Sequence, residues 1–173
     1  MLDYARQPSG FETVALSDII ERVREIAQPR LSGSNIQSQI SVAEGLPPIK
    51  ADVTQLEMAL LNLVTNALDA MPNGGTLSIT ATARPGEIRV EVADTGPGIP
   101  AEIMERLFDP WVTTKPTGEG TGLGLAIVRD VIRAHGGSVS AHNVATLPTL
   151  STGAVFVIDL PAGNSASSTG TPA

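Results

Sequence analysis

The chain has 173 residues, 42% of them apolar, which is enough for one domain with a hydrophobic core. Its 11 basic and 18 acidic residues give a formal charge of −7, and no basic run is present, which argues against a nucleic-acid partner. Cysteine is absent, so disulfides, thiolate metal sites and a cysteine nucleophile are excluded. No apolar run approaches the roughly 20 residues that span a bilayer, so we expect a cytoplasmic domain, whose parent protein could still be membrane-anchored.

The first elements are predicted to be a helix and a strand. Ser17 is a candidate N-cap for the helix, and Pro29 is expected to end it. The apolar residues of this helix recur at helical spacing: Ile19, Ile20, Val23 and Ile26. Residues 36–42 alternate apolar and polar side chains, which predicts a half-buried strand.

A long helix and a hairpin are predicted next. The helix runs over residues 52–71, with Asp52 or Thr54 as its cap and a Pro-Asn-Gly-Gly sequence after it. Residues 76–83 and 87–93 predict two strands joined by an Arg-Pro-Gly turn.

Residues 94–160 combine a segment rich in Gly and Pro with a predicted helix and two predicted strands. Residues 94–121 are rich in Gly and Pro, and only residues 101–107 predict a short helix, so this segment is a candidate lid. A helix is predicted over 123–134, and strands over 138–142 and 154–160. The order of elements predicts an α+β fold, in which a mixed sheet carries helices on one face.

Three polar residues share one stripe of the long helix. Asn62, Asn66 and Asp69 lie at i, i+4 and i+7, among apolar neighbours. One interpretation is that they cap or hydrogen-bond neighbouring backbone. The other is that they form a polar wall facing a ligand, since amide and carboxylate oxygens suit a hydrated Mg²⁺ ion.

A short turn follows the second strand of the predicted hairpin. Asp94 ends that strand, and Gly96, Gly98 and Ile99 follow it. An ordinary Asp/Gly turn explains the pattern. A carboxylate that accepts a hydrogen bond from an amino group, such as that of adenine, explains it as well.

Alternating glycines precede the last helix. Gly120, Thr121, Gly122, Leu123 and Gly124 place unshielded N–H groups at a helix N-terminus, where anions bind. A flexible loop is the alternative to a phosphate site. The order of residues matches neither a Walker A loop nor a dinucleotide fingerprint.

Taken in order, these motifs resemble those of the GHKL superfamily of ATPases and kinases, and in particular the catalytic domain of sensor histidine kinases. The resemblance rests on five segments: an asparagine box (62–70), a first glycine box (94–98), a phenylalanine box (108–115), a second glycine box (120–128) and a closing strand (153–161).

The resemblance implies an ATP and Mg²⁺ site and assigns its residues. Asn66 would hold Mg²⁺ with help from Asn62, and Asp94 would read adenine. Lys115 would be a lid cation near the phosphates. The remaining nucleotide-binding residues implied are Asp69, Gly96, Gly98, Ile99, Gly120, Thr121, Gly122, Leu123 and Gly124.

It also implies the fold, the domain organisation and the partners. The expected fold is a two-layer α/β sandwich, with a mostly antiparallel sheet of about five strands, three helices on one face and a nucleotide lid. Residues 13–161 would form the ATP-binding domain, 1–12 the remnant of a dimerisation segment and 162–173 a disordered tail. The isolated domain would be a monomer. Its parent would be a homodimer that works with a response regulator.

Asn62 separates two branches of the superfamily. ATPases of this superfamily carry a glutamate at this position as a general base, whereas an amide cannot usefully accept a proton at neutral pH. This favours phosphoryl transfer to a histidine of another segment, because neither His135 nor His142 has the surroundings of a phosphoacceptor. The alternatives are a GHKL-type ATPase, a serine kinase module, or a nucleotide-binding docking module without transfer activity.

Overall fold

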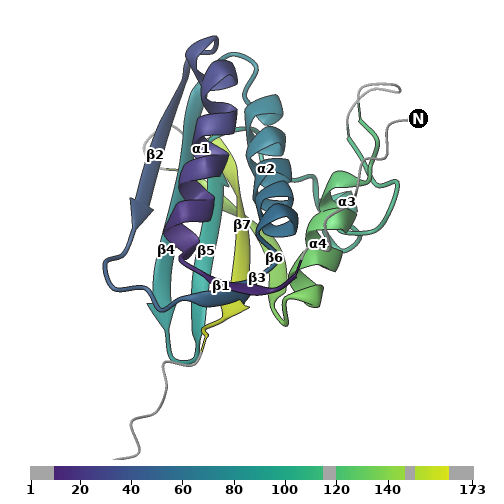
Figure 1. Ribbon diagram of the computed structural model, residues 1–173. Helices are drawn as coiled ribbons and strands as arrows, with labels where there is room; N and C mark the ends of the chain where they lie inside the picture. The colour runs from purple at the N-terminus through teal and green to yellow at the C-terminus, as the bar shows by residue number, and fades with distance from the viewer. Residues whose placement is uncertain (1–9, 115–119, 147–150, 164–173) are drawn as a thin grey trace, which may run out of the picture.

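The fold is a single sheet with helices on one face. A computed structural model describes residues 10–114, 120–146 and 151–163, and Figure 1 shows helices packed in front of the sheet. Strands β2 and β4 are parallel, and all other neighbours are antiparallel. The five strands follow the order β2 (Ile36–Val42), β4 (Gly75–Arg84), β5 (Glu87–Asp94), β7 (Ser151–Pro161) and β6 (Ser138–Thr146). The predicted α+β class and the mixed, mostly antiparallel sheet are confirmed.

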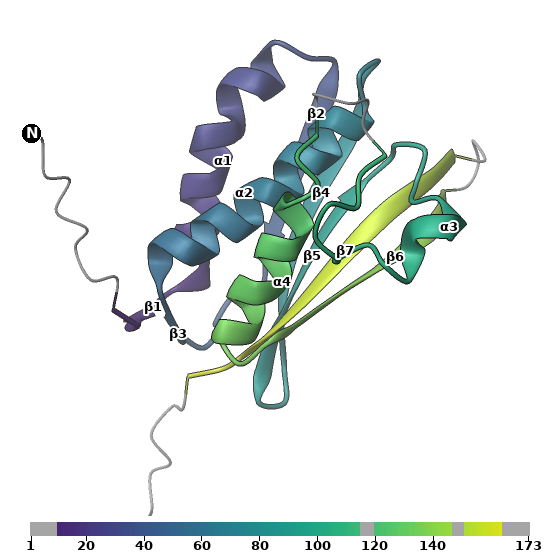
Figure 2. The same cartoon turned by 90° about the vertical axis from the view of Figure 1, so that its right-hand side faces the viewer.

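The helix layer is centred on α2. This helix (Val53–Ala70) lies between α1 (Leu16–Ser32) and α4 (Gly124–Ala134), as Figure 2 shows, while α3 (Ala101–Met104) is a single turn at the edge. Leu56 and Leu63 of α2 are fully buried in the core, which explains why an apolar helix occupies the centre. No helix in the described part of the chain is long and apolar enough to span a membrane.

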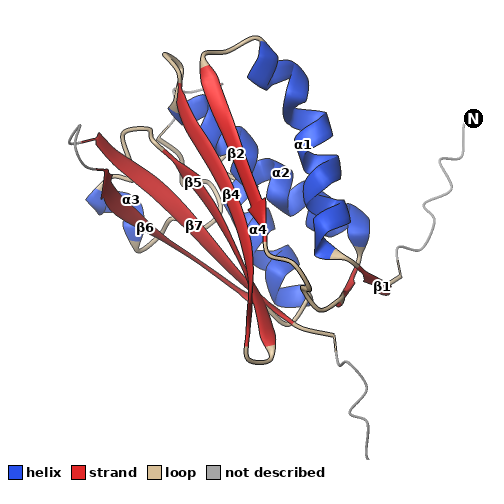
Figure 3. Cartoon of the chain, turned by 90° about the vertical axis from the view of Figure 1, so that its left-hand side faces the viewer, coloured by secondary structure: helices blue, strands red, loops and turns tan. Residues whose placement is uncertain are grey.

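The other face of the sheet carries polar side chains. Figure 3 shows the helices confined to one side of the strands. Arg89 and Asp159 lie opposite each other on β5 and β7 and form a two-pronged ion pair, with both N···O distances 2.7 Å. Alternation of buried and half-exposed residues along β5 therefore follows the period of a one-sided sheet.

Two predictions about α1 are wrong. The helix begins at Leu16 with Ala15 as its N-cap, and the Ser17 hydroxyl contacts Asp18 instead of capping. Pro29 lies inside the helix, which continues to Ser32. The last turn holds because Leu31 is buried and Gly33 donates its N–H to the Pro29 carbonyl. The helical spacing of Ile19, Ile20, Val23 and Ile26 is confirmed, although Ile26 is 54% exposed and the neighbouring Ala27 is buried.

Two three-residue strands were missed. β1 (Glu12–Val14) pairs antiparallel with β3 (Ile49–Ala51) beside the helices, apart from the main sheet. Beyond β7, Ala162 and Gly163 donate N–H groups to the carbonyls of Gly86 and Pro48. The rest of the expected tail, residues 164–173, lies outside the described residues, as do residues 1–9 of the expected dimerisation remnant.

His135 joins the ends of two helices. It is 7% exposed at the C-terminus of α4, and its Nδ1 donates to the Val131 carbonyl at 2.7 Å. Its Nε2 accepts the N–H of Asp52, the N-cap of α2, at 3.1 Å. The ring also lies against Phe11, with centroids 4.7 Å apart. His135 therefore has a structural role.

Candidate functional site

Asn62 and Asn66 lie one turn apart on the same side of α2. The helix is anchored at its start by Asp52, whose Oδ1 accepts the Gln55 N–H at 3.1 Å. Asn62, half-buried, points at the first residue of α4, since a Cβ at Gly124 would lie 3.3 Å from its Oδ1. Asn66 follows one turn later and is also half-buried. Asn62 therefore lies beside the N-terminus of α4, and Asn66 lies one turn farther along the same side of α2.

Asp69 has a partner in the protein itself. Its Oδ1 is 2.6 Å from Nη2 of Arg30 on α1, and its side chain is 30% exposed. The ion pair links α1 to the end of α2. Asp69 is therefore not an unpaired buried group in need of a ligand, and its place among the nucleotide-binding residues stays a prediction.

Asp94 is the buried carboxylate of the site. It ends β5 and is 6% exposed. Gly96 N–H donates to its Oδ1 at 2.8 Å and Ala154 N–H, more weakly, at 3.5 Å. Burial raises the pKa of Asp94 above its usual range, and the two backbone N–H groups offset part of that rise. Both of these hydrogen bonds go to Oδ1.

The turn after Asp94 is held against the sheet and α2. A Cβ at Gly96 would lie 2.9 Å from the Ala70 carbonyl oxygen, so the loop passes directly over the end of α2. Gly98 has a φ of +79°, which favours glycine. Thr95 Oγ1 accepts the Thr76 N–H at 2.9 Å. Packing within the protein accounts for both glycines, whether or not a base lies beside them.

The second glycine segment contacts the phenylalanine box. Gly122 has a φ of +65°, and a Cβ there would lie 2.6 Å from the carbonyl carbon of Trp111. Trp111 N–H donates to the Gly122 carbonyl at 2.8 Å, and Leu123 N–H donates to Thr121 Oγ1 at 3.3 Å. This places residues 120–123 immediately before α4. Lys115 lies outside the described residues, so its assignment stays a prediction.

The donor set fits a metal held jointly with a ligand. The described residues contain no group of three or more His, Cys, Asp or Glu side chains that could hold a metal ion by themselves. Asn62 and Asn66 offer two amide oxygens. Mg²⁺ usually keeps several waters and shares its coordination with phosphate oxygens, so a sparse protein contribution is the expected pattern.

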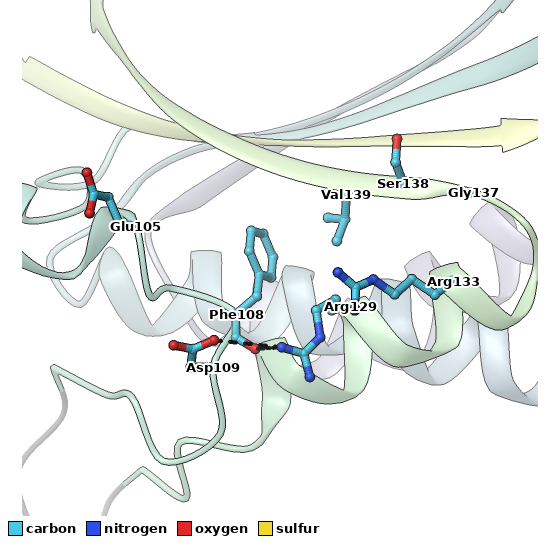
Figure 4. A pocket seen from close by; sticks show the side chains of 8 residues that line it. All are labelled: Glu105, Phe108, Asp109, Arg129, Arg133, Gly137, Ser138 and Val139. Carbon is cyan, nitrogen blue, oxygen red and sulfur yellow. Dashed lines mark hydrogen bonds and ion pairs between the residues drawn. The ribbon is translucent and has the colours of Figure 1, made fainter.

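A cavity of about 290 Å³ lies between α4, the start of β6 and residues 105–109 (Figure 4). Arg129 crosses its edge and donates to the Phe108 carbonyl at 2.9 Å, which ties α4 to the phenylalanine box. Phe108 itself meets Phe156 edge to face, with centroids 6.4 Å apart. The lining residues are Glu105, Phe108, Asp109, Arg129, Arg133, Gly137, Ser138 and Val139. These contacts position the segment that leads to the glycine loop.

Two residues that shape the site were not identified from the sequence. Asn143 on β6 holds Ile99 through two hydrogen bonds, of 2.7 and 2.8 Å. Gly153 lies so close to the Asp94 carbonyl oxygen that a Cβ would meet it at 2.0 Å. A lone Asn in a strand and a glycine at a strand start carry no signal of such contacts, because they depend on non-local pairing.

Comparisons with known proteins agree on one family. Residues 51–164 match the family described as histidine kinase-, DNA gyrase B-, and HSP90-like ATPase. The sensor kinase CckA of Brucella abortus (strain 2308) is 35% identical over 171 residues, which cover 90% of this chain and 18% of that protein. The sensor histidine kinase ZraS of Escherichia coli O157:H7 is 36% identical over 88% of this chain and 32% of that protein. The chain thus spans less than a third of the length of these relatives.

Solved structures of histidine kinases share the fold. The nucleotide-free catalytic domain of histidine kinase ThkA has a TM-score of 0.77 and 33% identity, covering 88% of this chain and 95% of that one. Full-length ShkA in complex with AMPPNP also has a TM-score of 0.77 and 33% identity, covering 92% of this chain and 33% of that one. ThkA has additionally been crystallised with the response regulator protein TrrA (TM-score 0.74, 30% identity, 88% and 42% covered).

Proposed function

Because this chain belongs to the family of histidine kinase-, DNA gyrase B- and HSP90-like ATPases and is a histidine-kinase catalytic domain, we propose that it transfers the γ-phosphate of ATP to a histidine on a separate dimerisation segment. In this step the bond between the γ-phosphorus and the β–γ bridging oxygen breaks, and a bond to an imidazole nitrogen forms. ADP leaves. The reaction needs mainly positioning and charge stabilisation.

One observation carries the proposal: two loops flank the same helix. The loop after Asp94 passes over the end of α2 at Ala70, and the N-terminus of α4 meets α2 at Asn62. A nucleotide laid along α2 would then place its base at Asp94 and its phosphates at residues 120–124. This order matches the requirements of adenine, which offers an amino donor, and of phosphate, which needs N–H donors.

The base would be recognised by Asp94. Its Oδ1 is already occupied by the Gly96 N–H, so Oδ2 would accept the exocyclic amine of adenine. Charge on a buried carboxylate strengthens such a bond. Gly98 and Ile99 would form the backbone wall next to the base.

Mg²⁺ would be held by Asn66, with Asn62 assisting, together with the phosphates and water. The bound ion would neutralise charge on the transferring phosphoryl group. Asn62 itself has no proton-accepting group at neutral pH, which favours transfer to a protein over hydrolysis. Lys115 would add positive charge from the lid, and Asp69, paired with Arg30, would bound the site on the α1 side.

The parent protein would be a homodimeric sensor kinase. Residues 13–161 would be its cytoplasmic ATP-binding unit, and the dimerisation segment would supply the phosphoacceptor histidine. The response-regulator complex of ThkA supports a response regulator as the downstream partner.

The test is a transfer assay. The domain is mixed with Mg²⁺–ATP labelled at the γ-phosphate and with the dimerisation segment of its parent. We expect phosphate on histidine, recognised by loss in acid and persistence in base, and none without the domain. Nucleotide binding without any transfer would contradict the kinase assignment and favour a docking module. Rapid ATP hydrolysis by the domain alone would favour an ATPase.

A further inference from the structure

The carboxamide of Asn143 pairs with both backbone groups of one loop residue. Ile99 N–H donates to Asn143 Oδ1 at 2.7 Å, and Asn143 Nδ2 donates to the Ile99 carbonyl at 2.8 Å. The two residues are 44 positions apart in the chain. This arrangement reproduces with a side chain the pair of bonds that a neighbouring strand would make. Because Asn143 accepts one of these hydrogen bonds and donates the other, the two partners also fix which end of the carboxamide is oxygen.

The loop between residues 94 and 99 is thereby held at both ends by two residues that lie opposite each other on neighbouring strands. Asn143 on β6 lies opposite Ala154 on β7. Ala154 N–H donates to Asp94 Oδ1 at the start of the loop, and Asn143 holds Ile99 at its end. The start is fixed further because Gly153 lies against the Asp94 carbonyl.

The close approach of Asn143 also explains Gly98. A Cβ at Gly98 would lie 2.9 Å from Asn143 Oδ1, closer than real Cβ contacts allow. The Asn143 carboxamide can therefore reach Ile99 only because residue 98 is a glycine. The Ile99 side chain, 9% exposed, adds an apolar anchor at the same point.

We propose that Asn143 is a positioning residue for base recognition, which holds the loop that begins at Asp94 in its nucleotide-binding shape. This rests on the proposed function. A loop ordered before binding loses less conformational entropy when the ligand arrives, so the carboxamide raises affinity for the base part of ATP. It does not act on the phosphates, which would bind at residues 120–124. Asn143 touches no substrate itself.

The test compares ATP with inorganic tripolyphosphate, a probe without a base. In Asn143→Ala, and in the nearly isosteric Asn143→Leu, we expect ATP affinity measured by calorimetry with Mg²⁺ to fall about tenfold, because two hydrogen bonds that order the loop are lost. Tripolyphosphate affinity should not change. The Ile99 amide should exchange hydrogen faster than in wild type, even without nucleotide. Unchanged thermal melting would exclude a general loss of folding.

The matched control is His142→Ala. The His142 side chain is exposed, and it lies on the opposite face of β6 from Asn143 because side chains alternate along a strand. It should leave ATP affinity and Ile99 exchange unchanged. Wild-type ATP affinity in both Asn143 variants would overturn the inference, and so would an equal loss of tripolyphosphate affinity. Failure of the wild-type protein to bind ATP would instead overturn the proposed function, and this inference with it.

Discussion

Replacing Asp94 by Asn separates base recognition from folding. Asn keeps the size of the side chain, and its Oδ1 can still accept the Gly96 N–H, which is 2.8 Å away. The change puts an NH₂ donor where Oδ2 stands. The exocyclic amine of adenine is also a donor, so the hydrogen bond proposed to fix the base is replaced by a donor–donor contact.

The magnitude follows from the charge and burial of this carboxylate. A hydrogen bond to a charged group contributes about 1.5–3 kcal/mol, and each 1.4 kcal/mol is about tenfold in affinity. We therefore expect the Kd for ATP to rise about 10- to 100-fold. The free energy of unfolding of Asp94→Asn should rise or stay constant. Burial raises the pKa of Asp94, so its ionised form destabilises the folded state at neutral pH, and the neutral Asn removes that cost.

Calorimetric titration with Mg²⁺–ATP measures the affinity, and urea unfolding at the same pH measures the stability. Asp18→Asn is the matched control, since Asp18 is an exposed carboxylate in the first turn of α1. An Asp94→Asn protein that binds ATP as tightly as wild type would refute the role assigned to Asp94. A loss of affinity that merely follows a loss of stability would refute it as well.

Three further predictions follow from the same site. Asn66→Ala should remove the Mg²⁺-dependent part of ATP affinity and leave binding in EDTA unchanged; equal losses in both titrations would argue against a metal ligand. Acidification should weaken ATP binding by the wild type at a pH above the usual range of an aspartic acid, because the pKa of Asp94 is raised and its protonated form accepts poorly; the effect should be absent from a pH series on Asp94→Asn. Gly153→Ala should lower the free energy of unfolding by about 1–3 kcal/mol or more in urea titration, because its Cβ would clash with the Asp94 carbonyl. Gly10→Ala, whose Cβ would meet nothing within 4 Å, should have little effect.

Elements with a local signal were predictable. Strand β2 was placed at its observed bounds because its alternating side chains mark one face. The β4–β5 hairpin was likewise readable from a short stretch of sequence, and Asp52 was one of the two residues predicted to cap α2. Asn62 and Asn66 could be placed on one side of a helix because i and i+4 residues lie one turn apart, while their role stays a prediction.

Features that depend on distant partners were not predictable. β1 and β3 have three residues each and exist because the fold brings residues 12–14 beside 49–51. Pro29 was expected to stop α1, but burial of Leu31 and the pairing of Arg30 with Asp69 support one more turn. Asn143 belongs to the same class, since its partner Ile99 lies 44 residues earlier in the chain.

The imidazole of His135 couples the local unfolding of two helix ends. It holds the N–H of Asp52 at the start of α2 and the Val131 carbonyl near the end of α4. Fraying of the last turn of α4 would therefore release the first turn of α2 as well, although the two are far apart in sequence. These turns should open as one cooperative unit in hydrogen exchange. Gly124, at the other end of α4, and Asn62, the α2 residue beside it, lie beyond that unit. The candidate phosphate site can therefore keep its structure while the opposite end of the helix pair opens.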